Sequence, residues 1–291
     1  MTTMESIAVE IAKLGAQFNP DILAATCAIY TDLIPPANKS IAVERDVPYG
    51  QDPRQRLDIY SRGEGTAKPV LLYVPGGGFT GGDKRIDETF YRNVAEWFVA
   101  RDFVVVTMNY RLAPAAPWPA GAEDVREALR WLESNVSRYG GDPRSVIVFG
   151  QSAGATHVVT ALFDPQFGAP SNGIRGVVLA SGFYRMTESH RAPNLAAYFG
   201  ADPSKYEARS PLAHVVTAPA LPVFLSVAEF DPAFLSAPTF LLAEALTRRN
   251  GRPPEVSWLK GHNHVSTVLS FGSGDDVFGE RIVSFARDAL A

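Results

Sequence analysis

Cysteine is nearly absent from this 291-residue sequence, which has a single one at position 27. One cysteine rules out an internal disulfide. Without a second cysteine three positions away, Cys27 offers no thiolate metal site, and we interpret it as a small buried hydrophobic residue. Hydrophobic residues make up 46% of the chain, so a core of ordinary globular size is expected.

Long apolar runs and blocks of basic residues are also missing. No run approaches the roughly 18 apolar residues of a membrane helix, and the start carries Glu5 and Glu10 without the basic segment of a signal peptide. The 31 acidic residues outnumber the 27 basic ones, so no surface for a nucleic acid backbone is expected. We therefore expect a soluble, cytoplasmic protein with no nucleic acid partner and no membrane span.

Short apolar runs alternate with amphipathic segments along most of the chain. The segments 41–47 and 56–60 alternate apolar with polar residues, which predicts a half-exposed antiparallel hairpin around YGQDP. Unbroken apolar runs predict strands buried on both faces at 70–74, 103–108, 145–149, 176–180, 222–227 and 255–259. Helical spacing predicts helices at 88–100, 121–138, 153–163, 239–249 and 277–290.

This alternation predicts the α/β class, with a mostly parallel eight-stranded sheet and helices on both faces. Two pieces fall outside the alternation: residues 1–40 form a helical extension, and residues 184–218 are a long insertion between two strands. Such insertions are usually functional covers, so we interpret this one as a cap over a pocket. Residues 41–291 then form one domain, because no repeat or Gly/Ser linker divides them.

A buried strand ends in GQSAG and leads directly into a helical segment. A serine on such a tight turn needs small residues two positions away, which Gly150 and Gly154 provide, and its hydroxyl then projects above the sheet. The pattern can arise by chance in a chain with 24 glycines, but its position after SVIVF favours a nucleophile. We therefore predict that Ser152 is the nucleophile.

A nucleophilic serine needs a base, and the base needs a group that holds its tautomer. When the serine lies on a strand-to-helix turn, the acid and then the histidine follow at the ends of later strands. Two later predicted strands lead into Glu229 and Asp231, and into His262 and His264. We favour Asp231, which lies in the loop, and His264, which precedes a helix start. Glu229 and His262 are the alternatives.

The two neighbouring histidines also allow a metal site, because HxH can supply two ligands. No Asp, Glu or Cys cluster completes the set, so we predict no metal site. The histidines at 157, 190 and 214 are interpreted as core or surface residues. His157 lies too far around its predicted helix from Ser152 to serve as the base.

Five glycines between positions 76 and 82 follow an apolar run, in YVPGGGFTGGDK. A phosphate loop would need Lys and then Ser or Thr after its last glycine, but Asp83 stands there. A dinucleotide loop, GxGxxG, would need an acidic residue at the end of the next strand, where Asn109 stands. An oxyanion hole remains as the interpretation that fits the rest of the chain.

Attack on a carbonyl by the serine creates an oxyanion, which needs donors already aimed at it. The backbone N–H groups of Gly77 and Gly78 can approach closely because neither residue has a side chain, and Ala153 supplies a third donor from the helix start. Loss of one such donor raises the barrier by on the order of 3 kcal/mol.

Aromatic residues near these motifs are candidates for the wall of an apolar pocket, which favours lipophilic substrates. Packing in the core or the cap is an equally good interpretation of each. The candidates are Phe79, Tyr184 and Phe234, together with Phe183, Tyr198 and Phe199.

Taken together, the motifs PGGGF, MNYRLAP, GGDP, GQSAGA, AEFDP and GHNHVS make residues 42–290 resemble the alpha/beta-hydrolase esterases. The similarity is greatest to the hormone-sensitive-lipase-like branch and its relatives, the bacterial carboxylesterases and kynurenine-formamidase-like enzymes. The resemblance implies short-to-medium acyl esters as substrates, without a cofactor. It assigns the catalytic work to Ser152, Asp231 and His264 as a triad and to Gly77, Gly78 and Ala153 as oxyanion donors.

Two positions depart from that branch. Pro75 stands where HGGG enzymes have histidine, and Gln151 replaces the acidic residue or histidine often found before the serine. GQSAGA is closer to the formamidase-like and isoprenylcysteine-methylesterase-like relatives. The sequence therefore predicts a serine carboxylesterase, with an aryl formamidase and then a dinucleotide-binding oxidoreductase as alternatives. The expected partner is a small-molecule ester, and a homodimer stays open.

Overall fold

Eight strands form a mixed sheet in the computed structural model, which describes residues 4–63, 67–190 and 192–291. The strand order is β1-β2-β4-β3-β5-β6-β7-β8; β2 pairs antiparallel with β1 and β4, and the later neighbours pair in parallel. The strands are β1 Ala42–Pro48, β2 Arg56–Ser61, β3 Lys68–Val74, β4 Val104–Met108, β5 Gly141–Gln151, β6 Ile174–Ala180, β7 Val223–Phe230 and β8 Glu255–Asn263. The expected eight-stranded, mostly parallel sheet is confirmed.

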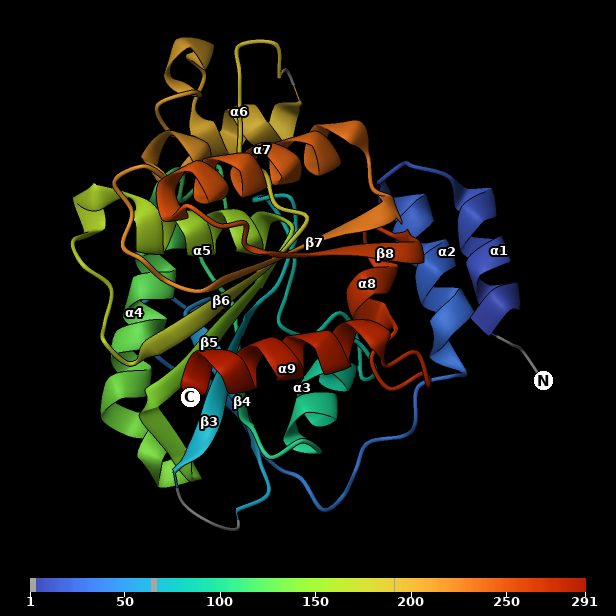
Figure 1. Ribbon diagram of the computed structural model, residues 1–291. Coiled ribbons are helices and arrows are strands. Elements are labelled where there is room, and N and C mark those ends of the chain that lie inside the picture. Colours follow the sequence, from blue (N-terminus) through green and yellow to red (C-terminus); the bar gives the residue numbers. More distant parts are fainter. Residues whose placement is uncertain (1–3, 64–66, 191) are drawn as a thin grey trace.

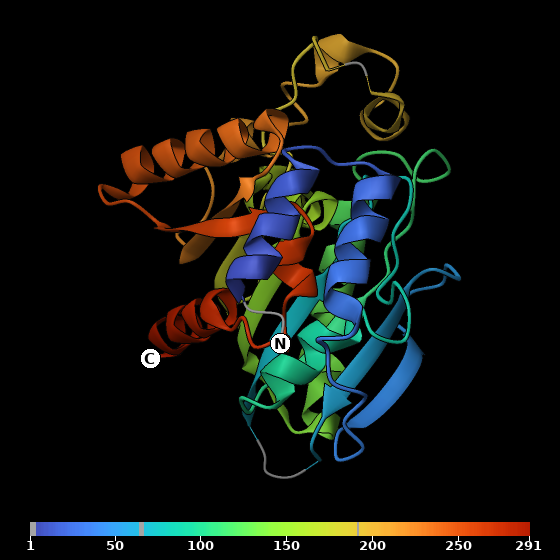
Figure 2. The same ribbon diagram turned by 90° about the vertical axis from the view of Figure 1, so that its right-hand side faces the viewer.

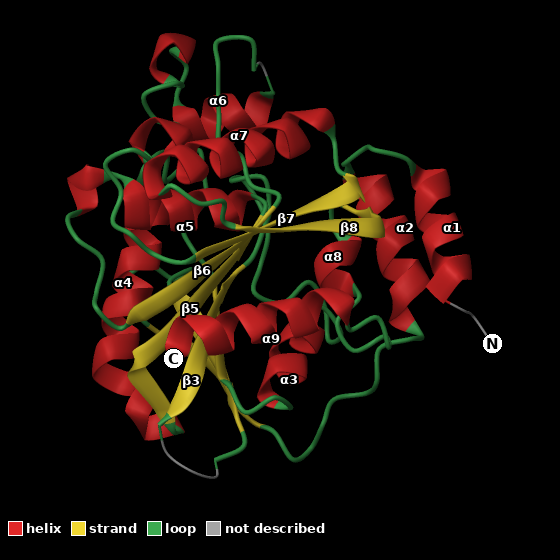
Figure 3. Ribbon diagram, viewed as in Figure 1, coloured by secondary structure: helices red, strands yellow, loops and turns green. Residues whose placement is uncertain are grey.

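Helices cover both faces of this sheet (Figures 1 and 3). One face packs against α4 (Ala120–Asn135), α5 (Ala153–Phe163) and α7 (Ala233–Asn250). The other packs against α3 (Arg92–Val99), α8 (Ser266–Leu269) and α9 (Val277–Leu290). In β3, Leu72 and Val74 face the first layer, whereas Leu71 and Tyr73 face the second. A strand covered on both faces needs apolar residues at every position, which explains the unbroken run in the sequence.

Three local expectations from the sequence are corrected. Strand β2 is buried along almost its whole length rather than half-exposed, because it lies between β1 and β4, and its Asp58 is paired with Lys84. Helix α3 begins at Arg92 instead of residue 88. Helix α7 begins six residues earlier than expected and continues through Pro238, since burial of its apolar face offsets the one backbone hydrogen bond that a proline removes.

The N-terminal extension consists of α1 (Met4–Leu14) and α2 (Pro20–Thr31). Helix α1 lies against β8 and buries Ile7 and Ile11, and α2 lies beside α8. Asn263 at the end of β8 donates from Nδ2 to Thr26 Oγ1 at 2.9 Å, which fixes α2 to the sheet. The connection between the two helices, including Phe18, is thereby held near the carboxyl ends of the parallel strands.

The insertion after β6 contains α6 (Pro193–Phe199) and 3-10 turns at Pro203–Lys205 and Pro211–His214. Figure 2 shows it standing above the rest of the molecule, over the connection between α1 and α2. A small apolar cluster that includes Phe79, Tyr198 and Phe199 joins it to the loop after β3. We call the insertion the cap from here on. No helix within the described residues is long and apolar enough to cross a membrane.

Candidate active site

Ser152 lies on a strained turn between β5 and α5. Its φ of 55° and ψ of −125° are angles that residues with a side chain rarely adopt. The turn closes only because its neighbours are small: a Cβ added to Gly154 would lie 2.1 Å from Val74 O, and one added to Gly150 would lie 2.6 Å from Ala155 Cα. The GxSxG spacing is therefore required by this close backbone packing.

The structure brings the side chains of Ser152, His264 and Asp231 into one hydrogen-bonded chain. His264 Nε2 lies 2.8 Å from Ser152 Oγ, and His264 Nδ1 lies 2.8 Å from Asp231 Oδ1. Asp231 Oδ2 accepts two further hydrogen bonds, from Ser181 Oγ at 2.5 Å and from Ala228 N at 2.7 Å. All three side chains are buried, so the carboxylate is held in one orientation and in turn holds the imidazole ring.

The two alternative residues have different partners. Glu229 Oε2 accepts a hydrogen bond from Gly261 N at the surface. His262 Nε2 pairs with Asp275 Oδ2 at 3.0 Å, and this hydrogen bond holds the pKa of the Asp275 carboxyl below its usual value. His262 and His264 thus point to separate partners and do not form a shared ligand pair. Within the described ranges no group of three His, Cys, Asp or Glu residues is placed to hold a metal.

The glycine loop after β3 lies directly beside Ser152. A Cβ on Gly76 would stand 2.9 Å from Ser152 Cβ, and one on Gly77 would stand 2.0 Å from Gly81 O. Gly77 and Gly78 have φ angles of 151° and 58°, which glycine adopts without strain. In the part of the chain that the structure describes, their N–H groups have no hydrogen-bond acceptor. They are therefore available to an oxyanion, beside the positive end of α5.

Side chains from other elements hold this loop in place of the histidine that Pro75 replaces. Tyr110 donates from its hydroxyl to Pro75 O at 3.0 Å, and Arg54 Nη2 donates to Gly82 O at 2.8 Å. Each bond uses a carbonyl of the loop and leaves the N–H groups of Gly77 and Gly78 unused. Proline's fixed φ and these two donors restrict the backbone of the loop at both of its ends.

Asn109 directly follows β4, where a dinucleotide-binding fold would carry an acidic residue for the ribose. Its Nδ2 donates to Asp83 Oδ2 at 2.7 Å, and its Oδ1 accepts from Lys84 N at 2.6 Å. The side chain is therefore used to hold the end of the glycine loop. This arrangement gives no support to the dinucleotide interpretation.

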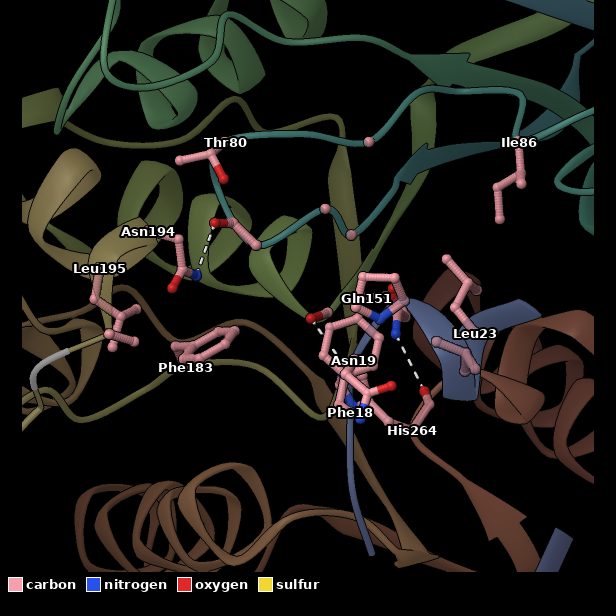
Figure 4. Close-up of a pocket in the computed structure, with 18 of the residues that line it drawn as sticks. Phe18, Asn19, Leu23, Thr80, Ile86, Gln151, Phe183, Asn194, Leu195 and His264 are labelled. Atoms are coloured by element: carbon pink, nitrogen blue, oxygen red, sulfur yellow. Dashed lines mark hydrogen bonds between the residues drawn. The ribbon is translucent and has the colours of Figure 1, made fainter. Parts of the chain in front are cut away.

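A cavity of about 750 Å³ opens above Ser152. In Figure 4, Phe18 and Leu23 of the N-terminal extension lie on the His264 side of it, and Phe183 and Leu195 lie on the opposite side. The other apolar residues of its wall are Pro20, Ile86, Tyr91, Ala192, Phe234 and Val265.

Four of the six candidate pocket residues do not line the cavity, namely Phe79, Tyr184, Tyr198 and Phe199, and those expectations are wrong. Phe79 is only 1% exposed and stacks on Tyr198 beneath the cap, with ring centroids 4.6 Å apart. Tyr184 is fully buried in the core on the α5 face of the sheet. Phe234 does line the cavity, where its ring lies 5.9 Å from that of Phe183.

His157 is a buried core residue, as expected from the sequence. Its Nδ1 lies 3.1 Å from the Tyr198 hydroxyl, and its ring packs edge-on against Tyr110. Burial lowers the pKa of this histidine to about 3, so the ring is neutral at ordinary pH. It takes no direct part in the chain of hydrogen bonds from Ser152 to Asp231.

Sequence reasoning missed several residues of the site. Phe18, Leu23 and Ile86 line the cavity, and Asn194 of the cap donates from Nδ2 to Gly78 O at 3.0 Å. No local pattern marks these residues, because their role depends on where the extension and the cap dock. Pro20 and Asn19 do signal a helix start: the Asn19 side chain accepts from Ile22 N at 3.0 Å and caps α2.

The BD-FAE family model matches residues 57–163, a region that contains the glycine loop and the serine turn. Among curated relatives, the esterase LipQ of Mycobacterium tuberculosis is 29% identical over 72% of this chain and 54% of its own. The esterase LipC of the same organism is 34% identical over 50% of this chain and 37% of its own. The chain thus spans about half or less of the length of these relatives.

Solved structures share the fold across almost the whole chain. Esterase B from Lactobacillus rhamnosis superposes with a TM-score of 0.74 at 20% identity, over 97% of this chain and 96% of its own. An esterase of the bacterial hormone-sensitive lipase family gives 0.73 at 21% identity, over 99% and 98%. This protein has the alpha/beta-hydrolase fold, and its resemblance to the alpha/beta-hydrolase esterases is confirmed.

Proposed function

We propose that this alpha/beta-hydrolase is a serine carboxylesterase, which cleaves lipophilic esters of short-to-medium acyl chains through an acyl-enzyme. The observation that carries the proposal is the continuous hydrogen-bonded chain from Ser152 through His264 to Asp231, which opens onto an apolar cavity. Similarity to proteins named esterases supports the same reaction. A module that only binds its ligand would have no use for a nucleophile, a base and an acid in this order.

In the acylation step, Ser152 Oγ attacks the ester carbonyl carbon while His264 Nε2 takes the hydroxyl proton. The carbonyl oxygen becomes an oxyanion, which accepts hydrogen bonds from the backbone N–H groups of Gly77, Gly78 and Ala153. Asp231 stabilises the imidazolium through Nδ1–H. The C–O bond to the alcohol then breaks, and the imidazolium gives its proton to the leaving oxygen.

Deacylation repeats these steps with water as the nucleophile. His264 takes a proton from water, the resulting hydroxide attacks the acyl-enzyme carbonyl, and the same N–H groups bind the second oxyanion. The proton then returns to Ser152 Oγ as the carboxylic acid leaves. The buried carboxylate of Asp231 keeps the ring in the Nδ1–H tautomer through both halves of the cycle.

The cavity favours neutral esters with apolar groups on both sides of the carbonyl. Apolar side chains line both sides of Ser152, and about 750 Å³ lies within the usual range for small-molecule sites. Among the described lining residues no lysine or arginine is available to pair with a carboxylate or phosphate, and Asp83 would repel one.

The test is hydrolysis of p-nitrophenyl acetate, butyrate, octanoate and laurate beside N-formylkynurenine, by the natural protein and by Ser152→Ala. We expect turnover of the shorter esters and none above background with the variant. Turnover of the formyl compound alone would replace this proposal with the aryl formamidase. Activity that survives in Ser152→Ala would overturn the mechanism. The matched control is Ser204→Ala, on the exposed surface of the cap, which should hydrolyse the esters as the natural protein does.

A further inference from the structure

The cap contacts the glycine loop after β3, here called the oxyanion loop (residues 76–82), through a hydrogen bond that involves none of Ser152, His264 and Asp231. Asn194, at the second position of α6, donates from Nδ2 to the carbonyl oxygen of Gly78 at 3.0 Å (Figure 4). A Cβ on Gly78 would lie 3.3 Å from the same nitrogen, so the amide packs directly on the loop. Both residues line the cavity above Ser152.

A second contact comes from the same face of the helix. Asn194 and Tyr198 are four residues apart on α6, a spacing that places both side chains on one face. Tyr198 stacks on Phe79 with an interplanar angle of 6°, and its carbonyl accepts from Trp118 N at 2.8 Å. Helix α6 thus holds two consecutive loop residues, one by a hydrogen bond and the next by ring stacking.

Glycine has the freest backbone of any residue, so a run of three glycines has no fixed conformation of its own. An oxyanion hole stabilises a transition state only when its donors are already oriented. The Asn194 amide restricts Gly78 through its carbonyl and leaves the N–H groups of Gly77 and Gly78 unused. The position of the cap and the order of the oxyanion donors are therefore linked through this side chain.

We propose that Asn194 is a positioning residue, which couples docking of the cap helix α6 to ordering of the oxyanion hole. The inference rests on the proposed esterase function. When α6 is docked, the Gly78 carbonyl is held and the donors are oriented; when α6 moves away, the loop is released. The cap then controls transition-state stabilisation as well as access to the cavity.

The first test compares Asn194→Ala with the natural protein on p-nitrophenyl butyrate. We expect kcat to fall about 3- to 10-fold, the usual effect of one neutral hydrogen bond, while KM stays within about twofold. Butylboronic acid forms a tetrahedral adduct with serine, so its inhibition constant should rise in parallel with the loss of kcat. Ser204→Ala, elsewhere on the cap, should change neither quantity.

Asn194→Asp keeps the shape but replaces the donor with a carboxylate oxygen facing the Gly78 carbonyl. We expect a larger loss at pH 8, about 10-fold or more, because two acceptors then face each other. The ratio of its kcat to that of the natural protein should rise as the pH falls, since a protonated carboxyl group can donate again. A merely structural role would give no such pH dependence.

The outcomes separate this inference from the function it rests on. If the natural protein does not hydrolyse the ester, the proposed function fails. If it does, and Asn194→Ala keeps its kcat and its inhibition by butylboronic acid within twofold, the positioning role is overturned. A change in KM alone would also overturn it, because Asn194 would then be only part of the cavity wall.

Discussion

The ring of Phe18 lies edge-on against the ring of His264, with the two centroids 4.8 Å apart. Phe18 belongs to the connection between α1 and α2, whereas His264 follows β8 at the other end of the chain. The N-terminal extension therefore covers the proposed base and supplies part of the cavity wall. It is part of the candidate site and not only an addition to the domain.

This contact predicts a modest loss of activity in Phe18→Ala. An aromatic pair of this geometry contributes about 0.5–1.5 kcal/mol beyond burial, so kcat/KM for p-nitrophenyl butyrate should fall about 2- to 10-fold. Phe240→Ala, at a phenylalanine that is 53% exposed on α7, is the control and should leave kcat/KM unchanged. Equal values for Phe18→Ala and the natural protein would show that the ring does not support His264.

Ser152 combines a proposed catalytic role with backbone strain, and two substitutions separate these. Ser152→Ala and Ser152→Gly should both lower kcat by at least about 10⁴-fold. Ser152→Gly should also have the higher free energy of unfolding, by about 1 kcal/mol, since glycine adopts a φ of 55° with a ψ of −125° more easily than alanine. Urea unfolding of the two variants measures the difference, and equal values would contradict the strain.

Asp231 and Glu229 are carboxylate candidates two positions apart that the structure places in different surroundings. Asp231→Asn should lower kcat by about 10⁴-fold, because an amide at this position either favours the wrong tautomer of His264 or faces the donor Ala228 N–H. Glu229→Gln should leave kcat near that of the natural protein, since the amide oxygen can still accept from Gly261 N. The measurement is kcat of both variants at pH 8. If Glu229 is the acid and Asp231 is not, Glu229→Gln will show the larger loss of kcat.

The glycines of the oxyanion loop differ in the space around them. Gly77→Ala should abolish activity and lower the melting temperature, because its Cβ would lie 2.0 Å from Gly81 O. The Cβ of Gly78→Ala would lie 3.3 Å from Asn194 Nδ2, a close contact that a small shift of the Asn194 side chain relieves, so the substitution should cost only about 1 kcal/mol for its φ of 58°. The measurements are the melting temperature and the rate of ester hydrolysis of both variants. A lower melting temperature or a lower rate in Gly78→Ala than in Gly77→Ala would contradict this prediction.

Burial of His157 predicts a pH dependence of stability. Its pKa is about 3 in the folded protein and about 6.5 in the unfolded chain, so between these values only the unfolded chain binds the proton. The histidine therefore destabilises the fold as the pH drops below about 6.5. From pH 7 to pH 5 the free energy of unfolding should fall about 2 kcal/mol further in the natural protein than in His157→Phe. Parallel curves for the two proteins would mean that His157 is protonated when folded.

Much of the fold and the reaction chemistry could be predicted from local sequence. Unbroken apolar runs located the buried strands, and the glycines around Ser152 indicated a tight turn because only small residues allow its close packing. The order of serine, acid and histidine followed from the order of the strands. The expected cytoplasmic location and a homodimer stay predictions.

The remaining parts depended on contacts between distant segments. The sequence shows an aromatic residue, Phe79, next to the glycines. It does not show that Phe79 packs beneath the cap while Phe18 lines the cavity. Asn194 has no sequence signature, since its role comes from where α6 docks on the glycine loop.

The sequence by itself determined the strand and helix order, the serine turn and the candidate catalytic side chains. Those features depend on backbone propensity and on residues close together in the chain. Only the tertiary structure decided which side chains surround the serine, because that depends on how the extension, the sheet and the cap pack against one another.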